Sequence, residues 1–382
     1  MTSSAQLTLD PRVALALPAH RLERLRSWME EERLDAVAVF GADHVTHLSG
    51  YARYYGGPSG LVIGRDGERT VVVMRDEVKV AERLSEADSV LGYGVRGFGV
   101  VLNPLPLLAD VVASVPAVSA AARLGLADGL GGIGSLLERR VSAEPVPADG
   151  AMYRLRLYKD EDELARILHS YSLCWLGQEA VSRAAQSGRA KEIELFTAAL
   201  AAAQTSHGEP VEFLCDLLSG PLTAEVCCPI HIASPRVAGP GEPVIADVVV
   251  RANGYWGDTA ETHVVGSNAD VSAGRAILLD ILAQAGAELR PGATGAEVFR
   301  AMERRILGAF PGGEFPHHGG HALGLTSFED PHVIPSDETP LEAGMVIAVE
   351  PGVYFAGRWG ARVENVFVVT ADGGVELREA VS

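Results

Sequence analysis

Two aspartates interrupt a stretch that otherwise has the composition of buried strands, residues 243–266 (PVIADVVVRANGYWGDTAETHVVG). The Asn-Gly dipeptide at 253–254 lies between two apolar runs and predicts a β-hairpin with a two-residue turn. In that register Ala260 faces Asp247, and Asp258 lies diagonally across from Asp247 on the same face of the sheet. Two carboxylates on one apolar face repel each other and lose hydration, so we expect a cation between them.

Histidines and glutamates interrupt three further runs later in the chain. His317 and His321 lie among glycines in HHGGHALGL, Glu350 interrupts MVIAVEPGVYF, and Glu364 interrupts RVENVFVVT. Taken singly, such histidines are often loop residues, and a strand glutamate often pairs with an arginine such as Arg362. Taken together with the two aspartates, four buried carboxylates would be left unexplained. We therefore interpret these residues as one site.

The combined set is rich in oxygen ligands and contains an imidazole. Such ligands suit hard and borderline divalent ions such as Mn(II), Co(II), Fe(II) and Zn(II). Four carboxylates able to bridge suit a pair of metals roughly 3.5–4 Å apart. A metal pair of this kind activates water and polarises a carbonyl, so the expected chemistry is hydrolysis of an amide bond.

Composition and charge restrict the class of protein. The chain has 382 residues, enough for two domains, and its 47% hydrophobic and 21% charged residues are typical of a soluble globular protein. A formal net charge of −18 argues against nucleic acid and anionic membranes as partners. The first twenty residues lack the features of a signal peptide, so we expect a cytoplasmic protein. The four cysteines lack CxxC spacing and are expected to be free, buried thiols.

The first part of the chain alternates strands and helices, which predicts a small α/β domain over residues 1–150. A helix is expected at 19–32, a strand in LDAVAVFG, and two strands joined at Asp66-Gly67 in LVIGRDGERTVVVM. The intervening HVTHLSGYARYYGGPSG has the composition of a loop. The stretch EPVPADGAM contains two prolines and a glycine and indicates a domain boundary.

The remainder, residues 151–382, shows the order helix, helix, strands twice. The first helix pair is a long helix that begins in DEDE, followed by EIELFTAALAAAQ; the second pair is AGRAILLDILAQAGAELR and GAEVFRAMERRIL. The repeated order predicts an α+β catalytic domain of two pseudo-symmetric helix-helix-sheet halves. A pseudo-twofold axis would bring equivalent strands from both halves around one central site.

The ordered ligand set resembles the creatinase, prolidase, aminopeptidase P and methionine aminopeptidase family, which has the pita-bread fold. The resemblance is carried by the eleven-residue step between the aspartates, GHxxGL around His321, EPG at Glu350 and RVE before Glu364. It covers essentially the whole chain, with a creatinase-like N-terminal domain. It implies a homodimer and two divalent ions, with manganese expected first and cobalt, iron or zinc as alternatives.

The resemblance also implies roles for individual residues. Asp258 and Glu364 would bridge the metals, Asp247 would bind one of them, and His321 and Glu350 the other. Glu350 would in addition be the general base.

Three residues around the ligands have implied roles in substrate handling or catalysis. His317 matches a position that contacts substrate in the prolidase-like branch. Arg362 would orient carboxylates around the site. His231 is the candidate for a histidine that the family has upstream of the first aspartate.

Two departures alter the surroundings of the expected metals. Where the peptidase branch carries a second histidine, seven residues after the metal histidine, this chain has Phe328, and His332 is a nearby candidate to replace it. The threonine-arginine pair that follows the second aspartate in the family is Ala260-Glu261 here. A phenyl ring can neither transfer a proton nor donate a hydrogen bond, so the departures change the layer that contacts the substrate.

Three functions follow from these observations. The leading expectation is a metallopeptidase of the Xaa-Pro aminopeptidase or dipeptidase type that acts on short peptides. The alternative is a hydrolase of a small non-peptide amide or other C–N bond, as in creatinase-like members, motivated by Phe328 and Ala260. The third is a non-catalytic binding protein on the same fold, which the complete ligand set disfavours.

Overall fold

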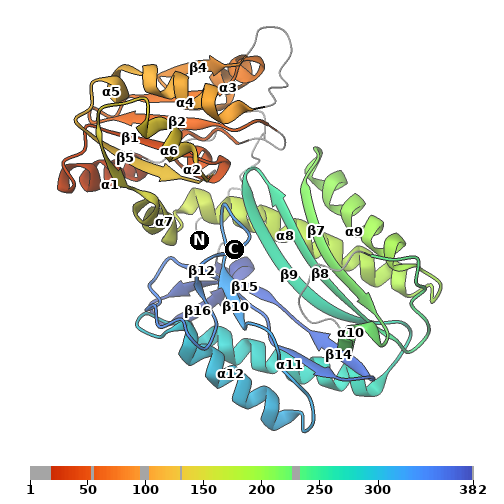
Figure 1. Ribbon diagram of the computed structural model, residues 1–382. Helices are drawn as coiled ribbons and strands as arrows, with labels where there is room; N and C mark the ends of the chain where they lie inside the picture. Colours follow the sequence, from red (N-terminus) through yellow and green to blue (C-terminus); the bar gives the residue numbers. More distant parts are fainter. Residues whose placement is uncertain (1–18, 53–55, 95–102, 130, 226–232, 381–382) are drawn as a thin grey trace, which may run out of the picture. The chain divides into compact units, whose positions relative to one another are not determined.

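The computed structural model describes residues 19–52, 56–94, 103–129, 131–225 and 233–380 (Figure 1). The chain divides into two compact units, Met1–Arg156 and Leu157–Ser382, and each unit has hydrophobic cores of its own. Among the described residues, no helix combines the length and the apolar character needed to cross a lipid bilayer.

The first unit is built on a six-stranded mixed sheet with the order β4-β3-β2-β1-β5-β6. All five residues of β1 are buried, because alternate side chains enter two separate cores, Val37 and Val39 on one face and Ala38 and Phe40 on the other. Because helices cover both faces of the sheet, β1 is apolar at every position instead of alternating apolar and polar residues. The strands are β1 (Ala36–Phe40), β2 (Gly60–Gly64), β3 (Arg69–Met74), β4 (Ser89–Tyr93), β5 (Arg123–Asp128) and β6 (Glu144–Pro147). The helices are α1 (Ala19–Glu31), α2 (Ala42–Ser49), the 3₁₀ helix η1 (Arg75–Glu77), α3 (Val78–Leu84), α4 (Pro104–Ser114), α5 (Pro116–Ser119), α6 (Ile133–Glu138) and α7 (Asp149–Leu157).

One segment of this unit differs from the sequence-based expectation, and a second is a strand for which no element was predicted. The start of the expected loop HVTHLSGY is helical and belongs to α2, whose buried face includes Val45 and Leu48. Gly50 ends the helix in the left-handed conformation, with φ 74° and its N–H donating to Thr46 O. The proline-rich start of the stretch expected to mark the domain boundary forms β6, which lies at the edge of the sheet, where prolines are tolerated.

The second unit repeats the order helix, helix, strands, as the sequence predicts. The first half contains α8 (Glu161–Ala185), α9 (Glu192–His207), β7 (Glu212–Ser219), α10 (Leu222–Glu225), β8 (Pro243–Ala252) and β9 (Tyr255–Val264). The second half contains α11 (Ala269–Glu288), α12 (Gly295–Ala309), β10 (Gly320–Ala322), β11 (Glu329–His332), β12 (Val346–Val349), β13 (Gly352–Phe355), β14 (Trp359–Arg362), β15 (Asn365–Thr370), β16 (Gly373–Glu376) and α13 (Leu377–Ala380). The sheets are β7-β8-β9, β11-β10-β12-β15-β16 and the pair β13-β14.

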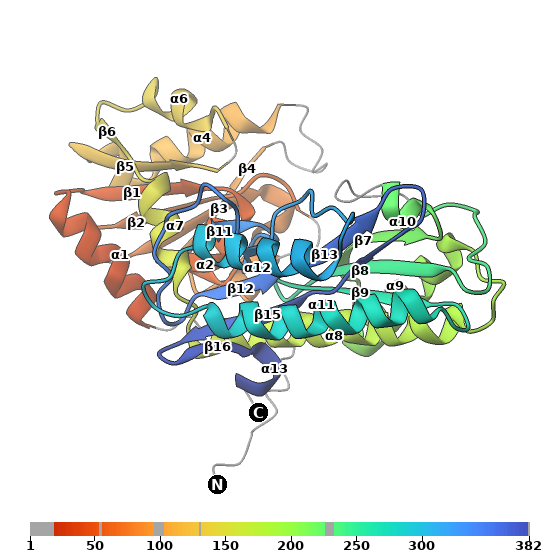
Figure 2. The ribbon, with the colours of Figure 1, turned by 90° about the horizontal axis from the view of Figure 1, so that it is seen from below.

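Helix α8 packs along β8 and β9 (Figures 1 and 2). It begins with a capping box, in which Asp160 Oδ1 accepts from Glu163 N at 3.0 Å and Glu163 Oε2 accepts from Asp160 N at 3.1 Å. The approach to β9 is close at Gly257, where an added Cβ would lie 2.2 Å from Tyr171 N. The helix thus supports the strand segment that carries Asp258.

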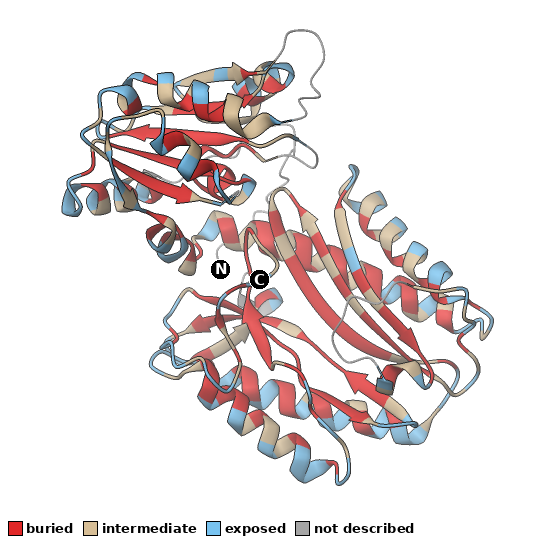
Figure 3. Cartoon of the chain, in the orientation of Figure 1, coloured by how far each residue is buried: buried red, intermediate tan, exposed pale blue. Residues whose placement is uncertain are grey.

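Hydrogen bonds join the two halves directly beside the candidate ligands. Glu364 N donates to Ala260 O at 2.9 Å, and Thr259 Oγ1 donates to Glu364 O at 3.0 Å. The Thr262 hydroxyl accepts from Arg362 N at 2.9 Å and donates to Arg362 O at 2.8 Å. The strands that meet here are largely buried, whereas the outward faces of the helices are exposed (Figure 3). The centre of the second unit is therefore a place where strands from both halves are held together.

Candidate active site

The two aspartates of the hairpin share one face of the sheet. Asn253 and Gly254 form the turn with φ values of 52° and 84°, as a two-residue type I′ turn requires. Asp247 pairs with Ala260, and Val249 pairs with Asp258. The predicted register is therefore confirmed, and Asp258 lies diagonally across from Asp247.

The second half contributes His321, Glu350 and Glu364, each from a different strand or strand end. His321 lies in β10 opposite Ala348 of β12. Glu350 directly follows β12, and its N–H donates to Gly319 O at 3.0 Å. Glu364 lies in the short break between β14 and β15 rather than inside a strand as expected, because its N–H bonds across to the first half.

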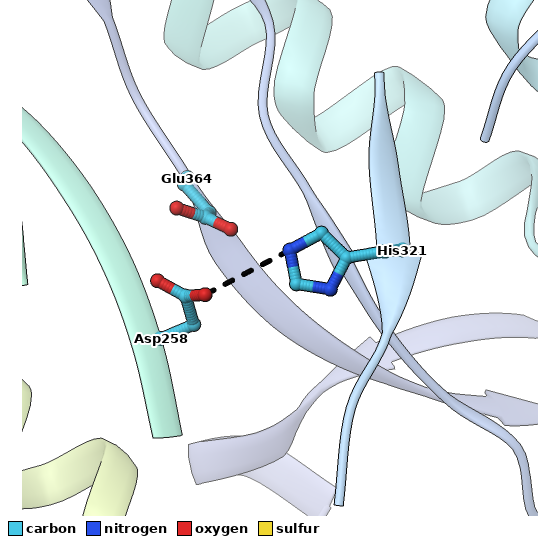
Figure 4. A group of neighbouring side chains, drawn as sticks. All are labelled: Asp258, His321 and Glu364. Carbon is cyan, nitrogen blue, oxygen red and sulfur yellow. Dashed lines mark ion pairs between the residues drawn. The ribbon is translucent and has the colours of Figure 1, made fainter. Parts of the chain in front are cut away.

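Asp258, His321 and Glu364 converge on one point (Figure 4). Each offers a ligand atom, these atoms lie within 4.8 Å of one another, and all three residues are buried. Asp258 Oδ2 lies 3.7 Å from His321 Nε2. Asp258 Oδ1 and Glu364 Oε1 are buried and have no hydrogen-bond partner among the described residues. Buried carboxylate oxygens without donors beside an imidazole fit a divalent cation.

Burial perturbs the protonation of these groups. Burial, reinforced by the neighbouring carboxylates, raises the pKa of Asp258 and of Glu364 well above the usual range. Burial also raises the pKa of Asp247 to about 6, although the charge of Arg362 opposes that shift. Burial lowers the pKa of His321 to about 4, so its imidazole is neutral at pH 7 and able to bind a metal. A bound cation would stabilise the ionised form of these carboxylates and so lower their pKa values.

Glu350 differs from the other acidic residues because imidazoles surround it. Burial disfavours its ionised form, but the hydrogen bond and charge of His318 and the charge of His317 lower its pKa to about 2. Its Oε1 lies 3.0 Å from His318 Nδ1 and 4.0 Å from His321 Nε2. His317 lies behind it, with Nδ1 3.8 Å from Glu350 Oε2 and Nε2 3.0 Å from the hydroxyl oxygen of Tyr354. Glu350 is therefore ionised at neutral pH.

Arg362 is a buried guanidinium in contact with several acidic or polar groups. Its Nη2 lies 2.9 Å from Asp247 Oδ2 and 3.6 Å from Asp216 Oδ2, and its Nη1 lies 3.5 Å from the hydroxyl oxygen of Tyr354. Burial disfavours its charged form, but Tyr354 and the neighbouring carboxylates keep the pKa of Arg362 above its usual range. Arg362 thus orients Asp247, which lies next to Asp258.

A cavity of about 90 Å³ lies over these groups. Its lining includes all five expected ligands and Arg362, together with Leu214, Cys215, Asp216, Val249, His318, Ser327 and Phe328. Phe328 is 56% exposed, and its ring lies over that of His321, with ring centroids 4.1 Å apart. His317 is not among the lining residues.

Of the expected histidines, His332 is described by the structure but stands apart from the cavity. His332 pairs with His321 across the sheet, but its Nδ1 lies 3.1 Å from Asp330 Oδ1 and it is not part of the lining. His231 lies outside the described residues, as do Cys227 and Cys228. Cys174 and Cys215 are buried and free, as expected.

His318 and Asp216 are cavity residues that the sequence interpretation missed. His318 is the second histidine of the HHGGH run, of which only His317 and His321 were assigned. Asp216 interrupts the strand sequence EFLCDLLS, which is the same signal that identified Asp247. Both residues stand in patterns that point to a site, but only their neighbours in the folded chain show that they belong to it.

Comparison with known proteins agrees with this geometry. Residues 163–371 match metallopeptidase family M24, and residues 21–158 match the creatinase/prolidase N-terminal domain. The chain is 30% identical over 327 residues to the probable dipeptidase PepE of Mycobacterium tuberculosis, covering 83% of this chain and 82% of that protein. It is 26% identical over 362 residues to the Xaa-Pro dipeptidase of Pyrococcus horikoshii, covering 94% of this chain and 96% of that protein.

A solved structure shows the same architecture. The Xaa-Pro dipeptidase from Bacillus anthracis matches with a TM-score of 0.78 and 23% identity, covering 94% of this chain and 97% of that one. This likeness confirms the expected pita-bread fold with its N-terminal domain. The chain therefore belongs to metallopeptidase family M24 and is a metal-dependent peptidase with a creatinase/prolidase N-terminal domain.

Proposed function

We propose that this protein is a dinuclear metallopeptidase that cleaves Xaa-Pro bonds in short peptides. The observation that carries the proposal is the convergence of Asp258, His321 and Glu364, with two buried carboxylate oxygens that lack a hydrogen-bond partner among the described residues. Asp247 and Glu350 line the same cavity. The name of the Pyrococcus horikoshii relative, an Xaa-Pro dipeptidase, suggests the substrate.

The five residues divide between two ions in this proposal. Asp258 and Glu364 would bridge the ions, Asp247 would bind one, and His321 and Glu350 the other. Manganese is the ion we expect, with cobalt, iron or zinc as alternatives. When bound, the ions would supply an activated water and polarise the scissile carbonyl.

Glu350 is assigned as the general base. It is ionised at neutral pH and lines the cavity, so it can accept a proton from an attacking water. His318 Nδ1 lies 3.0 Å from Glu350 Oε1, and its hydrogen bond and charge keep the carboxylate ionised and therefore able to accept that proton. Arg362 keeps Asp247 in place, and Phe328 provides an apolar surface at the cavity for a substrate side chain.

The test is an activity screen with metal-free protein reconstituted separately with Mn(II), Co(II), Fe(II) and Zn(II). Gly-Pro, Ala-Pro and longer Xaa-Pro peptides distinguish a dipeptidase from an aminopeptidase, and Ala-Ala controls for prolyl selectivity. Release of proline, or of the first residue of the longer peptides, with at least one ion supports the proposal. Absence of prolyl cleavage with every ion rejects it.

A small non-peptide amide is the second candidate substrate. The observation that favours it is the ring of Phe328, which is exposed and lies over His321. Ala260 is buried opposite Asp247 and offers no hydroxyl group. Small amides in the same screen test this candidate: hydrolysis of an amide without cleavage of any Xaa-Pro peptide would select it. Failure to bind any of the four ions would instead favour a non-catalytic binding protein.

A homodimer and a cytoplasmic location stay predictions. Light scattering of the full chain tests the first, and fractionation of cells that produce the protein tests the second.

A further inference from the structure

Two histidines meet where helix α8 packs against helix α9 in the second unit (Figure 1). His169 Nε2 lies 3.0 Å from His207 Nδ1, and the two rings are tilted by 53° with their centroids 5.2 Å apart. Both residues are partly exposed, so an ion can reach them from solvent. Neither lines the active-site cavity, so the pair is separate from the proposed metal ligands.

The two imidazoles are neutral at pH 7. Burial lowers the pKa of both, and each pKa starts from a usual value of 6.5. In the hydrogen bond between them, one ring donates its N–H and the other accepts it with a lone pair. A change of tautomer in the donor ring moves its proton to the other ring nitrogen without any change of charge. Two nitrogen lone pairs are then available at the same place.

The separation of the two nitrogens is close to that of two ligands on one ion. Nitrogen ligands bind Zn(II) at about 2.0–2.1 Å, so two of them lie about 3.3 Å apart in a tetrahedral shell. His169 Nε2 and His207 Nδ1 are 3.0 Å apart. A small rotation of the two rings is therefore enough for both lone pairs to meet a single ion.

The surroundings of His207 favour a positive charge. His207 lies in the last turn of α9, and the carbonyl groups at the end of a helix form the negative end of its dipole. Gly208 ends the helix in the left-handed conformation, with φ 84°, and Glu209 follows it. The charge of Glu209 opposes the lowering of the His207 pKa, so this carboxylate acts on the imidazole as a nearby negative charge.

The type of ligand selects the type of ion. In the part of the chain that the structure describes, Asp258, His321 and Glu364 are the one group of three or more close ligand residues. The His169–His207 pair therefore supplies two protein ligands, and water completes the shell. Imidazole nitrogens suit Zn(II), Ni(II) and Cu(II), whereas Mn(II) prefers oxygen ligands. The pair thus suits a different ion from the manganese expected in the cavity.

We propose that His169 and His207 form a metal site, separate from the active site, that binds a borderline divalent ion such as Zn(II). The ion joins α8 to α9 and has a structural role. Ser170, the next residue of α8, holds the hairpin that carries Asp258: its Oγ accepts from Ala252 N at 3.2 Å and donates to Tyr255 O at 2.9 Å. The proposal does not depend on the proposed peptidase function.

The test is a titration of the metal-free full chain with Zn(II), followed by calorimetry, with bound zinc counted by elemental analysis after gel filtration. The variants are His169→Gln and His207→Gln. The control is His20→Gln, which removes an exposed histidine of α1 in the first unit. Each variant of the pair should bind one zinc ion fewer than the wild type, or bind its last ion at least about tenfold more weakly, whereas His20→Gln should match the wild type.

Only the difference between the proteins counts, so the result is independent of how many ions the cavity binds. Mn(II) binding by the oxygen-rich cavity should be equal in wild type and variants, which shows that the variants keep their fold. ¹⁵N nuclear magnetic resonance of the wild type needs no variant: Zn(II) should shift the His169 Nε2 and His207 Nδ1 resonances. Equal zinc stoichiometry and Kd in the wild type and both variants, or ring resonances unchanged by saturating Zn(II), would overturn the proposal.

Discussion

At the scale of single residues, the carboxyl groups of the site differ because their neighbours differ. Asp258 and Glu364 face other carboxylates, and burial raises the pKa of both. Glu350 faces His318 and His317, which lower its pKa to about 2. This difference fits the proposed roles, in which all three residues bind metal and only Glu350 also accepts a proton.

The repulsion among the ligands predicts how stability depends on pH in the metal-free protein. A carboxyl group whose pKa is higher in the folded than in the unfolded chain binds more protons when folded, so the free energy of unfolding falls as pH rises. For Asp247 this range runs from the usual value of 3.8 to about 6. Buried histidines such as His321 act in the opposite direction, so the comparison is made with a variant. We expect the gain in the free energy of unfolding of Asp247→Asn over the wild type to be larger at pH 7 than at pH 5, measured by urea denaturation with chelator present.

The variant Asp258→Asn should relieve that repulsion. Without metal at pH 7 its free energy of unfolding should be about 1–2 kcal/mol higher than that of the wild type, because a buried acidic group is removed. Added manganese should stabilise the wild type but not the variant. Asp280→Asn, on a helix away from the cavity, serves as the control. A variant less stable than the metal-free wild type would contradict the proposed repulsion.

The variant Glu350→Gln should fold and lose turnover. The amide cannot accept the proton, and we expect a loss of kcat of about 10²–10⁴-fold. The readouts are kcat with the best peptide substrate, the far-UV circular dichroism spectrum and bound metal content. Retention of wild-type kcat would exclude Glu350 as the base.

At the scale of elements, close backbone contacts determine where the ligands lie. Gly257 precedes Asp258 on β9, and an added Cβ would lie 2.2 Å from Tyr171 N in α8. The strand can approach the helix only without a side chain there, so Gly257 links the position of α8 to the position of a proposed metal ligand.

Gly257→Ala should therefore affect both stability and metal binding. The overpacking should cost about 1–3 kcal/mol in the free energy of unfolding and weaken manganese affinity by displacing Asp258. Gly308→Ala is the matched control, because an added Cβ on this α12 residue has no neighbour within 4 Å. Denaturation and metal titration compare the two. Equal effects of both substitutions would refute the role of the α8 contact.

A buried ion pair anchors the loop that carries Phe328. Lys159 Nζ lies 2.9 Å from Glu329 Oε2, and Leu325 N and Thr326 N donate to Glu329 Oε1. Lys159→Ala should cost about 3–5 kcal/mol, since it leaves a buried carboxylate without its cation. Arg183→Ala, which breaks an exposed pair with Glu179, should cost less than about 1 kcal/mol. Similar losses of stability in urea would show that Lys159–Glu329 is not an anchor.

At the scale of the whole molecule, the site joins two halves of one unit. Of the proposed ligands, Asp247 and Asp258 come from the first half and the remaining three come from the second. An ion held by both halves stabilises their association, by about 2.7 kcal/mol at a free metal concentration of a hundred times Kd.

Metal addition should accordingly slow hydrogen exchange in both halves. Amides of β8, β9, β10 and β15 should gain protection when manganese is added, while those of β1–β6 in the first unit serve as the internal control. Hydrogen-exchange mass spectrometry measures all of them together. Protection confined to one half would mean that the ion does not bridge the halves.

The sequence alone determined the features that rest on local chemistry. The turn at Asn253-Gly254 sets the hairpin register, because few residues adopt two successive positive φ values, and the register places Asp247 and Asp258 on one face. The repeated order of helices and strands followed from periodicity and capping residues. Helix α2 was wrongly expected to be a loop, because its glycine-containing end indicates irregular chain by composition, whereas Gly50 ends the helix in the left-handed conformation.

Only the tertiary structure decided which of the remaining polar residues belong to the site. His318 reaches Glu350 whereas His332 pairs with Asp330, and no local signal separates the two histidines. Asp216 becomes a neighbour of Asp247 through the pairing of β7 with β8, between residues far apart in the chain. The pKa values also depend on burial and on charges from distant segments. Contacts between such segments arise from packing, and a linear pattern does not encode which of them meet.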